Sequence, residues 1–195
     1  MHEAISKNNA IYFESARAYP SCHRGVKWAS KESQFTRFKV LCEIASDSFQ
    51  SRILDVGCGL GHLVDYLLSQ SFTGTYEGID IVDQMVVNAK KRHPTFDFKT
   101  NDIDAIVCGS VDYVMASGLF AFVDLNLIQE MIPQLFLRAT KGLAFNCLST
   151  AAVHKEADVF YQDPTEIINF CKSITPTVML RHDYMPHDFT IYMMK

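Results

Sequence analysis

Hydrophobic residues in the middle of the chain alternate between two spacings, which predict alternating strands and helices. Short runs rich in β-branched and aromatic residues are typical of buried strands, whereas apolar residues three or four positions apart are typical of one face of a helix. The expected strands are 52–56, 75–81, 96–99, 111–116 and 142–148, and the expected helices are 60–69, 82–92, one within 126–139, and 164–174. Repeated β–α units of this kind predict an α/β fold built on a mostly parallel sheet.

The last part of the chain follows a different pattern. Two β-rich runs, 178–182 and 189–194, are separated only by a short polar loop that contains Pro186. A crossover helix does not fit in that loop, so the two runs are expected to pair as an antiparallel hairpin. The mostly parallel sheet should therefore be closed by one antiparallel strand.

The first 50 residues contain no clear strand. A helix is expected over 33–45, where Phe35, Phe38 and Leu41 recur at mostly helical spacing. Residues 1–49 carry seven Lys and Arg against five Asp and Glu, while the remainder carries eleven against seventeen. The mildly basic segment weakly favours an anionic substrate nearby, and a solvated surface of mixed charge is the simpler interpretation.

The composition is that of one globular unit. The chain has 195 residues, of which 48% are hydrophobic and 21% charged, and a formal net charge of −4. A protein that binds nucleic acid through its phosphates is usually basic, so this class of partner is disfavoured. The six cysteines form no C-x-x-C pair, the N-terminus lacks an apolar signal segment, and no apolar run is long enough to span a bilayer. These features predict a cytoplasmic protein with reduced cysteines.

A glycine-rich turn follows the first expected strand. The segment 53–62 reads Ile-Leu-Asp-Val-Gly-Cys-Gly-Leu-Gly-His. Glycines let the backbone turn sharply and approach a ligand closely, and the helix behind them offers free N–H groups. In an open α/β sheet, ligands bind at the carboxyl ends of the strands, where this turn lies. The turn therefore predicts a ligand site.

Asp80 ends the second expected strand, about 20 residues after the glycines. Its carboxylate is placed to accept hydrogen bonds from both hydroxyls of a ribose. His62 stands where the dinucleotide fingerprint has its third glycine, and no G-K-S/T sequence follows the turn. A nicotinamide-dependent oxidoreductase and a P-loop protein are therefore disfavoured.

These motifs resemble those of class I S-adenosylmethionine-dependent methyltransferases. Residues 54–61 resemble motif I of that family almost letter for letter, 78–80 resemble the second motif with its ribose-binding acid, 101–103 resemble the third, and 111–117 resemble the fourth strand. The resemblance covers about 52–195. It implies a Rossmann-like, seven-stranded, mostly parallel sheet with an antiparallel last strand, and a site for S-adenosylmethionine.

The resemblance also implies which residues bind the cofactor. Asp80 would bind the ribose, while Asp102 would lie beside the adenine amino group and Ile103 on the adenine ring. Asp104 is close enough in sequence to compete for the role of Asp102. The full expected set is Asp55, Gly57, Cys58, Gly59, Gly61, Asp80, Ile81, Asp102, Ile103 and Ser117, with Gln34 and Arg37 from the N-terminal segment.

The N-terminal segment carries a looser resemblance. Residues 28–38 resemble a segment of small bacterial methyltransferases of undefined substrate. On this basis, residues 1–50 are expected to form a helical lid on a cofactor-binding domain of residues 51–195, as one structural unit. Gln34 or Arg37 would then meet the methionine carboxylate or the substrate. An equally weighted alternative places both side chains on the polar face of a surface helix.

Three side chains are expected to form the site for the methyl acceptor. Tyr161 lies in the loop after the fifth expected strand, and His182 and Tyr184 lie near the end of the sixth, so all three should face the carboxyl edge of the sheet. They are expected to line an aromatic acceptor pocket that Trp28 helps to close, with His182 as a base because imidazole titrates near neutrality. The alternative is that the tyrosines pack the sheet edge and His182 is solvated.

Absent signatures narrow the substrate class. Residues 116–120 read Ala-Ser-Gly-Leu-Phe, without the Asn/Asp-Pro-Pro-aromatic signature of enzymes that methylate nucleic-acid amino groups, and Cys147 does not follow a proline. His154 and Asp158 have helical ligand spacing but no clear third ligand, so no metal is expected. The favoured function is methyl transfer from S-adenosylmethionine to O or N of a small metabolite. An RNA or protein methyltransferase, and a non-catalytic cofactor-binding protein with the same fold, are the alternatives.

Overall fold

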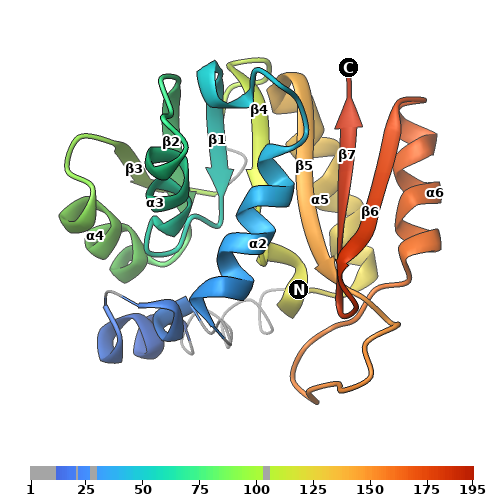
Figure 1. Cartoon of the computed structure of the whole chain (residues 1–195), viewed down its shortest axis with the longest axis horizontal. Coiled ribbons are helices and arrows are strands. Elements are labelled where there is room, and N and C mark those ends of the chain that lie inside the picture. The colour runs from blue at the N-terminus through green and yellow to red at the C-terminus, as the bar shows by residue number, and fades with distance from the viewer. Residues whose placement is uncertain (1–11, 21, 27–29, 103–105) are drawn as a thin grey trace.

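The described residues form one seven-stranded sheet with helices on both faces (Figure 1). The computed structural model describes residues 12–20, 22–26, 30–102 and 106–195. The strands follow the order β3-β2-β1-β4-β5-β7-β6 across the sheet. Their bounds are β1 Arg52–Val56, β2 Thr75–Asp80, β3 Asp97–Thr100, β4 Val111–Ala116, β5 Ala139–Leu148, β6 Val178–Met185 and β7 Asp188–Met194.

Helices cover the two faces of the sheet. One hydrophobic cluster packs α2, α3 and α4 on one face, and a second cluster packs α5 and α6 on the other. Residues 12–18 are also helical. The α-helices are α2 Lys31–Cys42, α3 His62–Ser69, α4 Asp83–Arg92, α5 Leu125–Arg138 and α6 Pro164–Ile174, and the short 3₁₀ helices are η1 His23–Val26, η2 Ser48–Gln50 and η4 Leu119–Phe122.

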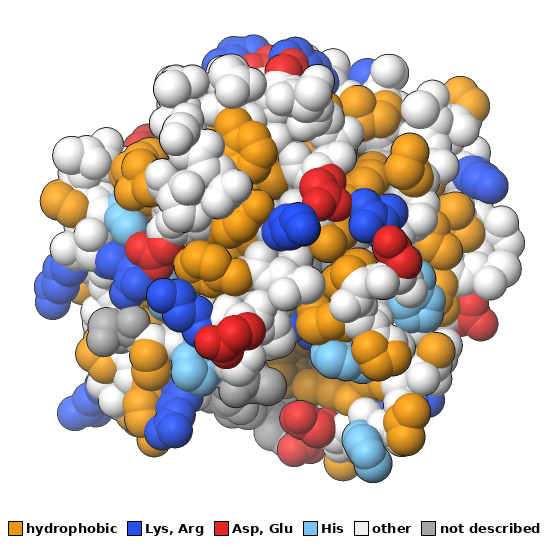
Figure 2. Space-filling model, viewed as in Figure 1, with side chains coloured by type: hydrophobic (Ala, Val, Ile, Leu, Met, Phe, Trp, Pro, Cys, Tyr) orange, Lys and Arg blue, Asp and Glu red, His pale blue; other side chains and the backbone are white. Residues whose placement is uncertain are grey.

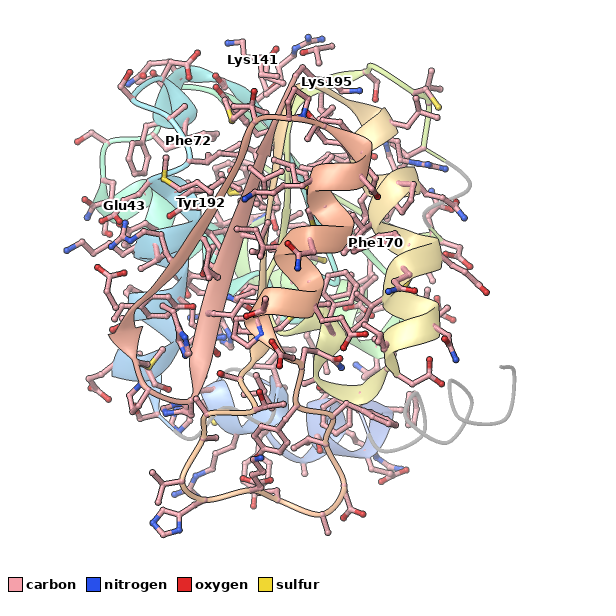
Figure 3. The ribbon with its side chains drawn as sticks, turned by 90° about the vertical axis from the view of Figure 1, so that its right-hand side faces the viewer. Glu43, Phe72, Lys141, Phe170, Tyr192 and Lys195 are labelled. Carbon is pink, nitrogen blue, oxygen red and sulfur yellow. The ribbon has the colours of Figure 1, made fainter. Side chains whose placement is uncertain are left out.

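Successive side chains of the central strands point to opposite faces of the sheet, so each strand contributes to both clusters. In β4, Val114 enters the α5 and α6 cluster, while Tyr113 and Met115 enter the α2, α3 and α4 cluster. Figure 3 shows the same division at the edge of the sheet, with Tyr192 on the side of α2 and Phe170 on α6 at the opposite face. Both faces of the sheet are therefore shielded from water, as expected for a mostly parallel sheet.

The antiparallel strand predicted at the end of the chain is confirmed. β7 pairs antiparallel with both β5 and β6, whereas the β1–β2, β1–β4, β2–β3 and β4–β5 pairs are parallel. Only residues 186–187 separate β6 from β7, which leaves no room for a crossover. Because β7 inserts between β5 and β6, β6 becomes the edge strand of the sheet.

Local capping explains where two helices begin. The Ser30 Oγ accepts a hydrogen bond from the Ser33 backbone N–H at 3.0 Å, so α2 starts at Lys31 rather than at Ser33. Gly61 has a left-handed φ of 73°, which a helix does not tolerate, so α3 starts at His62 rather than at Leu60. Within the described residues, no helix has the length and apolar composition needed to cross a membrane.

Asp55 is a buried acid in the centre of this sheet. It lies on β1, is 3% exposed, and its Oδ2 accepts a hydrogen bond of 2.7 Å from the Tyr76 hydroxyl on the neighbouring strand. Burial raises the pKa of Asp55 to about 7, and the Tyr76 hydrogen bond opposes this rise only in part. The folded protein therefore holds a proton on Asp55 at pH values where an exposed aspartate is ionised.

This burial makes a prediction for the pH dependence of stability. An unfolded aspartate ionises near pH 4, so between about pH 4 and pH 7 only the folded state keeps this proton. The contribution of Asp55 to the free energy of unfolding is then greatest below pH 4 and is lost as the pH rises to about 7. Asp55→Asn keeps an oxygen that can accept a hydrogen bond from Tyr76, and it removes this loss of unfolding free energy at rising pH. From pH 5 to pH 8, urea unfolding should show the variant gaining about 2–3 kcal/mol relative to wild type.

The same measurement contains its own control. Every other titrating group is shared by the two proteins, so their effects cancel in the difference of unfolding free energies. A difference that stays constant from pH 5 to pH 8 would show that Asp55 ionises normally in the folded protein.

Candidate functional site

A cavity of about 710 Å³ lies at the carboxyl ends of the central strands. It is lined by the glycine turn after β1, by α2 and η4, and by the loop of residues 149–163 that connects β5 to α6. The volume falls within the range of small-molecule sites, roughly 300–1,000 Å³. In Figure 2, the lower part of the molecule, where these strand ends lie, is hollowed, with hydrophobic side chains inside and acidic and histidine side chains at the rim.

The glycine turn is held against the second strand by backbone hydrogen bonds. The Gly57 and Cys58 N–H groups both donate to the Ile79 carbonyl, at 2.9 and 3.0 Å. Gly57 and Gly59 line the cavity and have positive φ angles of 74° and 53°, which favour glycine. A Cβ on Gly59 would lie 2.8 Å from the Val26 side chain, so this position also needs glycine for space.

Gly61 has a different role from the other two glycines. It does not line the cavity, although its φ is also positive. A Cβ on Gly61 would lie 3.0 Å from the ring of Phe98 on β3, so the absence of a side chain lets α3 pack against the sheet. Any contribution of Gly61 to a ligand is therefore through the shape of the turn.

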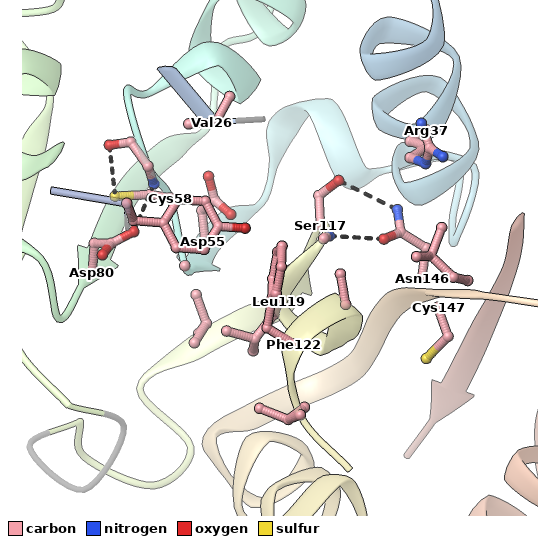
Figure 4. Close-up of a pocket in the computed structure, with 18 of the residues that line it drawn as sticks. Val26, Arg37, Asp55, Cys58, Asp80, Ser117, Leu119, Phe122, Asn146 and Cys147 are labelled. Atoms are coloured by element: carbon pink, nitrogen blue, oxygen red, sulfur yellow. Dashed lines mark hydrogen bonds between the residues drawn. The ribbon is translucent and has the colours of Figure 1, made fainter. Parts of the chain in front are cut away.

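Asp80 connects the end of β2 to this turn. Its Oδ2 accepts from the Gly59 N–H and its Oδ1 from the Val82 N–H, both at 2.9 Å. Burial raises the pKa of Asp80, while these backbone hydrogen bonds lower it. Asp80 and Ile81 both line the cavity, so the acid lies beside the glycine turn, and its contact with a ribose stays a prediction (Figure 4).

The predicted adenine site lies only partly within the described residues. Asn101 and Asp102 line the cavity on the β3 side. Ile103 and Asp104 lie outside the described residues, as does Trp28. Asp102 therefore lies at the cavity, while its contact with the adenine amino group and the contact of Ile103 with the adenine ring both stay predictions.

Helix α2 forms one wall of the cavity through two buried polar side chains. Gln34 and Arg37 are 3% and 4% exposed and line the cavity, so they do not lie on the polar face of a surface helix. Gln34 Nε2 lies 3.2 Å from His62 Nδ1 at the start of α3. Arg37 Nε donates to Asp188 Oδ2 at 2.5 Å, at the start of β7. The helix is thus attached both to the start of α3 and to the start of β7.

Asp188 is a member of the site that the sequence did not reveal. It is 2% exposed and lines the cavity. Burial raises its pKa, and the Arg37 guanidinium acts in the opposite direction. Its Oδ1 accepts a hydrogen bond of 2.5 Å from the Tyr184 hydroxyl, which also lies 2.8 Å from Thr190 Oγ1. No local pattern marks an acid at the start of a strand as buried, so sequence alone offered no signal for this residue.

The prediction of an acceptor pocket from three side chains needs correction. Tyr161 lines the cavity, but His182 and Tyr184 do not. His182 packs against the Phe189 ring, with ring centroids 6.0 Å apart, and Tyr184 contacts Asp188 behind the cavity wall. Both residues belong to β6, and β7 lies between β6 and β5. His182 and Tyr184 therefore lie at the same edge of the sheet as Tyr161 but do not reach the cavity.

Two histidines and an apolar wall that the sequence did not predict line the cavity instead of His182 and Tyr184. His154 and His187 line the cavity, from the loop 149–163 and from the turn between β6 and β7. Leu119 and Phe122 of η4 form an apolar wall, and Tyr12 packs edge-on against Phe122 with ring centroids 5.4 Å apart. The sequence predicted strands and α-helices but not this short 3₁₀ helix after β4.

The cysteines of the cavity are not suited to nucleophilic attack. Cys58 and Cys147 are 7% and 2% exposed, and burial raises both thiol pKa values well above the ordinary value. A thiol must ionise to act as a nucleophile, so these neutral thiols serve as small packing groups. Within the part of the chain that the structure describes, no three His, Cys, Asp or Glu side chains gather as metal ligands.

Comparison with known proteins agrees with this geometry. A family model described as a methyltransferase domain matches residues 53–141, which contain the glycine turn and Asp80. A Mycobacterium tuberculosis protein named methyltransferase Rv1506c is 34% identical over 165 residues, which cover 77% of this chain and 96% of that relative.

Solved structures share the whole fold at low sequence identity. The DhpI–SAM–HEP complex gives a TM-score of 0.77 at 11% identity and covers 98% of both chains. Magnesium protoporphyrin IX methyltransferase from Synechocystis PCC 6803 with bound SAH gives a TM-score of 0.70 at 15% identity, covering 96% of this chain and 95% of that one. Together with the relative that matches over nearly its whole length, these findings show that the chain belongs to the class I methyltransferases, enzymes that take their methyl group from S-adenosylmethionine.

Proposed function

We propose that this methyltransferase transfers the methyl group of S-adenosylmethionine to O or N of a small metabolite. The observation that carries the proposal is the cavity, which begins at the glycine turn and continues past η4 to the loop 149–163. Its volume of about 710 Å³ suits a cofactor together with a small acceptor. Helix α2 and the loop 149–163 wall it in, which favours a compact acceptor over an extended polymer.

The cofactor would lie along the carboxyl edge from β3 to β4. In this arrangement Asp102 meets the adenine, Asp80 meets the ribose hydroxyls, and the amino-acid part lies over the glycine turn near Ser117. Gln34 or Arg37 then contacts the methionine carboxylate or the acceptor. S-adenosylmethionine supplies a methyl group already activated by its sulfonium, so the main task of the protein is to align the acceptor and to exclude water.

The acceptor would occupy the part of the cavity between η4 and the loop 149–163. Leu119 and Phe122 offer apolar contacts there, and Tyr161 offers a polar tip on an aromatic ring. An acceptor that keeps its proton at neutral pH needs a base, and His154 and His187 both line the cavity. His62 also lines it, but its ring lies against the Gln34 side chain. His154 and His187 replace His182 in this role.

A labelling screen tests the proposal. The purified protein is incubated with radiolabelled S-adenosylmethionine and a metabolite extract, and the products are separated by size. Label in small molecules supports the proposal, and the labelled compound identifies the acceptor. Label only in RNA or protein of a matched extract would instead assign a macromolecular substrate. Cofactor binding without any labelled product would assign a binding protein without catalysis.

Removing the ribose acid should weaken cofactor binding without unfolding the protein. Loss of a charged hydrogen-bond partner costs about 1.5–3 kcal/mol, so Asp80→Ala should raise the Kd for S-adenosylhomocysteine roughly 10- to 100-fold in calorimetry. Wild type should bind S-adenosylmethionine or S-adenosylhomocysteine and not NAD.

Two variants separate direct contact from damage to the turn. Asp80→Asn keeps an acceptor for a backbone N–H but loses the charge, and it should bind at an intermediate level. Glu77→Ala removes an acid from the same strand outside the cavity and should bind like wild type. Tight binding by a folded Asp80→Ala protein would exclude Asp80 as the ribose ligand.

The glycine turn offers a second prediction with a matched control. Gly59→Ala combines an unfavourable φ of 53° with a Cβ 2.8 Å from Val26, whereas Gly109→Ala has a similar φ of 66° and its nearest neighbour at 3.9 Å. Both variants should lose about 1 kcal/mol or more of unfolding free energy from backbone strain. Only Gly59→Ala should also lose cofactor affinity, by tenfold or more. Equal cofactor affinity in the two variants would contradict a close approach of the ligand to Gly59.

A further inference from the structure

The side chain of Asn146 connects the ends of β4 and β5 at the cavity wall. Asn146 is 2% exposed and lies near the end of β5. Its Oδ1 accepts a hydrogen bond from the Gly118 N–H at 2.8 Å, and its Nδ2 donates to Ser117 Oγ at 3.3 Å (Figure 4). All three residues line the cavity. The Asn146 amide therefore binds both the backbone of the turn after β4 and the Ser117 hydroxyl in the cavity.

The orientation of this amide is fixed by its backbone partner. A backbone N–H can only donate, so the Asn146 atom that faces Gly118 must be the oxygen. A flipped amide would place its NH₂ group against the Gly118 N–H and leave both donors without an acceptor. The Nδ2 group therefore has to face Ser117.

This orientation decides what Ser117 can do. Because Nδ2 donates to Ser117 Oγ, the Ser117 hydroxyl hydrogen must point elsewhere. Within the described residues, no protein group accepts that hydrogen. Ser117 is half-buried and lines the cavity, across from Asp80 in Figure 4. Its free hydrogen is thus available to a bound ligand, and the matching ligand group must carry a lone pair.

The nearby acid does not compete for this hydrogen. Asn146 is in register with Thr190 on β7, which places Asp188 beyond it on the same strand. Both Asp188 oxygens are engaged, one by Arg37 Nε and the other by the Tyr184 hydroxyl. The negative charge on this wall is therefore matched by an arginine, and a second anion can approach Ser117.

We propose that Asn146 is a positioning residue that fixes Ser117 as a hydrogen-bond donor to a ligand carboxylate. The inference rests on the proposed function, because the cavity is taken as the place where cofactor and acceptor meet. The carboxylate belongs either to the amino-acid part of the cofactor or to the acceptor. An ammonium group has no lone pair, so it gains nothing from Ser117 in this arrangement.

Two variants test the polarity of this contact. Ser117→Ala removes the donor. Asn146→Asp keeps an oxygen for the Gly118 N–H but replaces Nδ2 with a second oxygen, so the Ser117 hydroxyl turns back to donate to it. Both variants should lose carboxylate binding, by roughly tenfold for one hydrogen bond to a charged group. Thermal unfolding checks that each remains folded.

Paired ligands identify the source of the carboxylate. S-adenosylhomocysteine carries the amino-acid group, and 5′-methylthioadenosine is the same thioether without it. If the cofactor supplies the carboxylate, both variants lose affinity for S-adenosylhomocysteine and keep their affinity for 5′-methylthioadenosine. If the acceptor supplies it, both affinities are unchanged. In that case, benzoate serves as a carboxylate probe and benzylammonium as its positively charged control. Wild type saturated with S-adenosylhomocysteine should bind benzoate and not benzylammonium, and each variant should lose affinity for benzoate.

The double variant separates polarity from charge. Asn146→Asp also adds a negative charge, which repels a carboxylate with or without Ser117. The loss of carboxylate affinity caused by Asn146→Asp should therefore be clearly smaller in a Ser117→Ala background than in wild type. An equal effect in both backgrounds would overturn the positioning role of Asn146.

The outcomes also separate this inference from the proposed function. Wild type that binds neither nucleoside thioether would contradict the proposed function and the inference with it. Wild type that binds both, with Ser117→Ala unchanged for both thioethers and for benzoate, would overturn the inference alone.

Discussion

The Ile79 carbonyl fixes the path of the chain at the end of β1. It accepts hydrogen bonds from both Gly57 and Cys58, so the strand cannot continue straight and must turn beside β2. The turn requires positive φ angles, and glycine allows them. It also brings the Gly59 N–H to Asp80 at the end of the neighbouring strand. The pairing of β1 with β2 thereby places the glycine turn and Asp80 together at the cavity.

Helix α2 closes this site because its buried polar groups need partners. A buried amide or guanidinium without a hydrogen bond is costly, and Gln34 and Arg37 find theirs in His62 and Asp188. These partners belong to α3 and β7, on either side of the cavity. The helix is therefore held in one orientation by polar contacts in addition to the apolar packing of residues such as Phe38.

The strands and helices, the glycine turn and the acid that follows it could all be predicted from the sequence. Strand and helix spacing is a local property, so the predicted elements agree with the structure to within a few residues at most ends. Few residue types adopt the positive φ angles of the turn, so glycines in this pattern predict the turn from the sequence. The antiparallel last strand was also predictable, because the loop before it is too short for a crossover.

Which distant side chains share the cavity could not be predicted, because it depends on the tertiary structure. His182 and Tyr184 were correctly placed at the carboxyl edge, yet β7 lies between them and β5, and they do not line the site. Asp188 and His187 line it instead. The orientation of Asn146 likewise depends on Gly118, 28 residues away in the chain. Periodicity gives the direction in which a side chain leaves its strand, but the order of strands across a sheet depends on long-range pairing and packing. The part of the cavity that we propose for the acceptor depends on such long-range contacts.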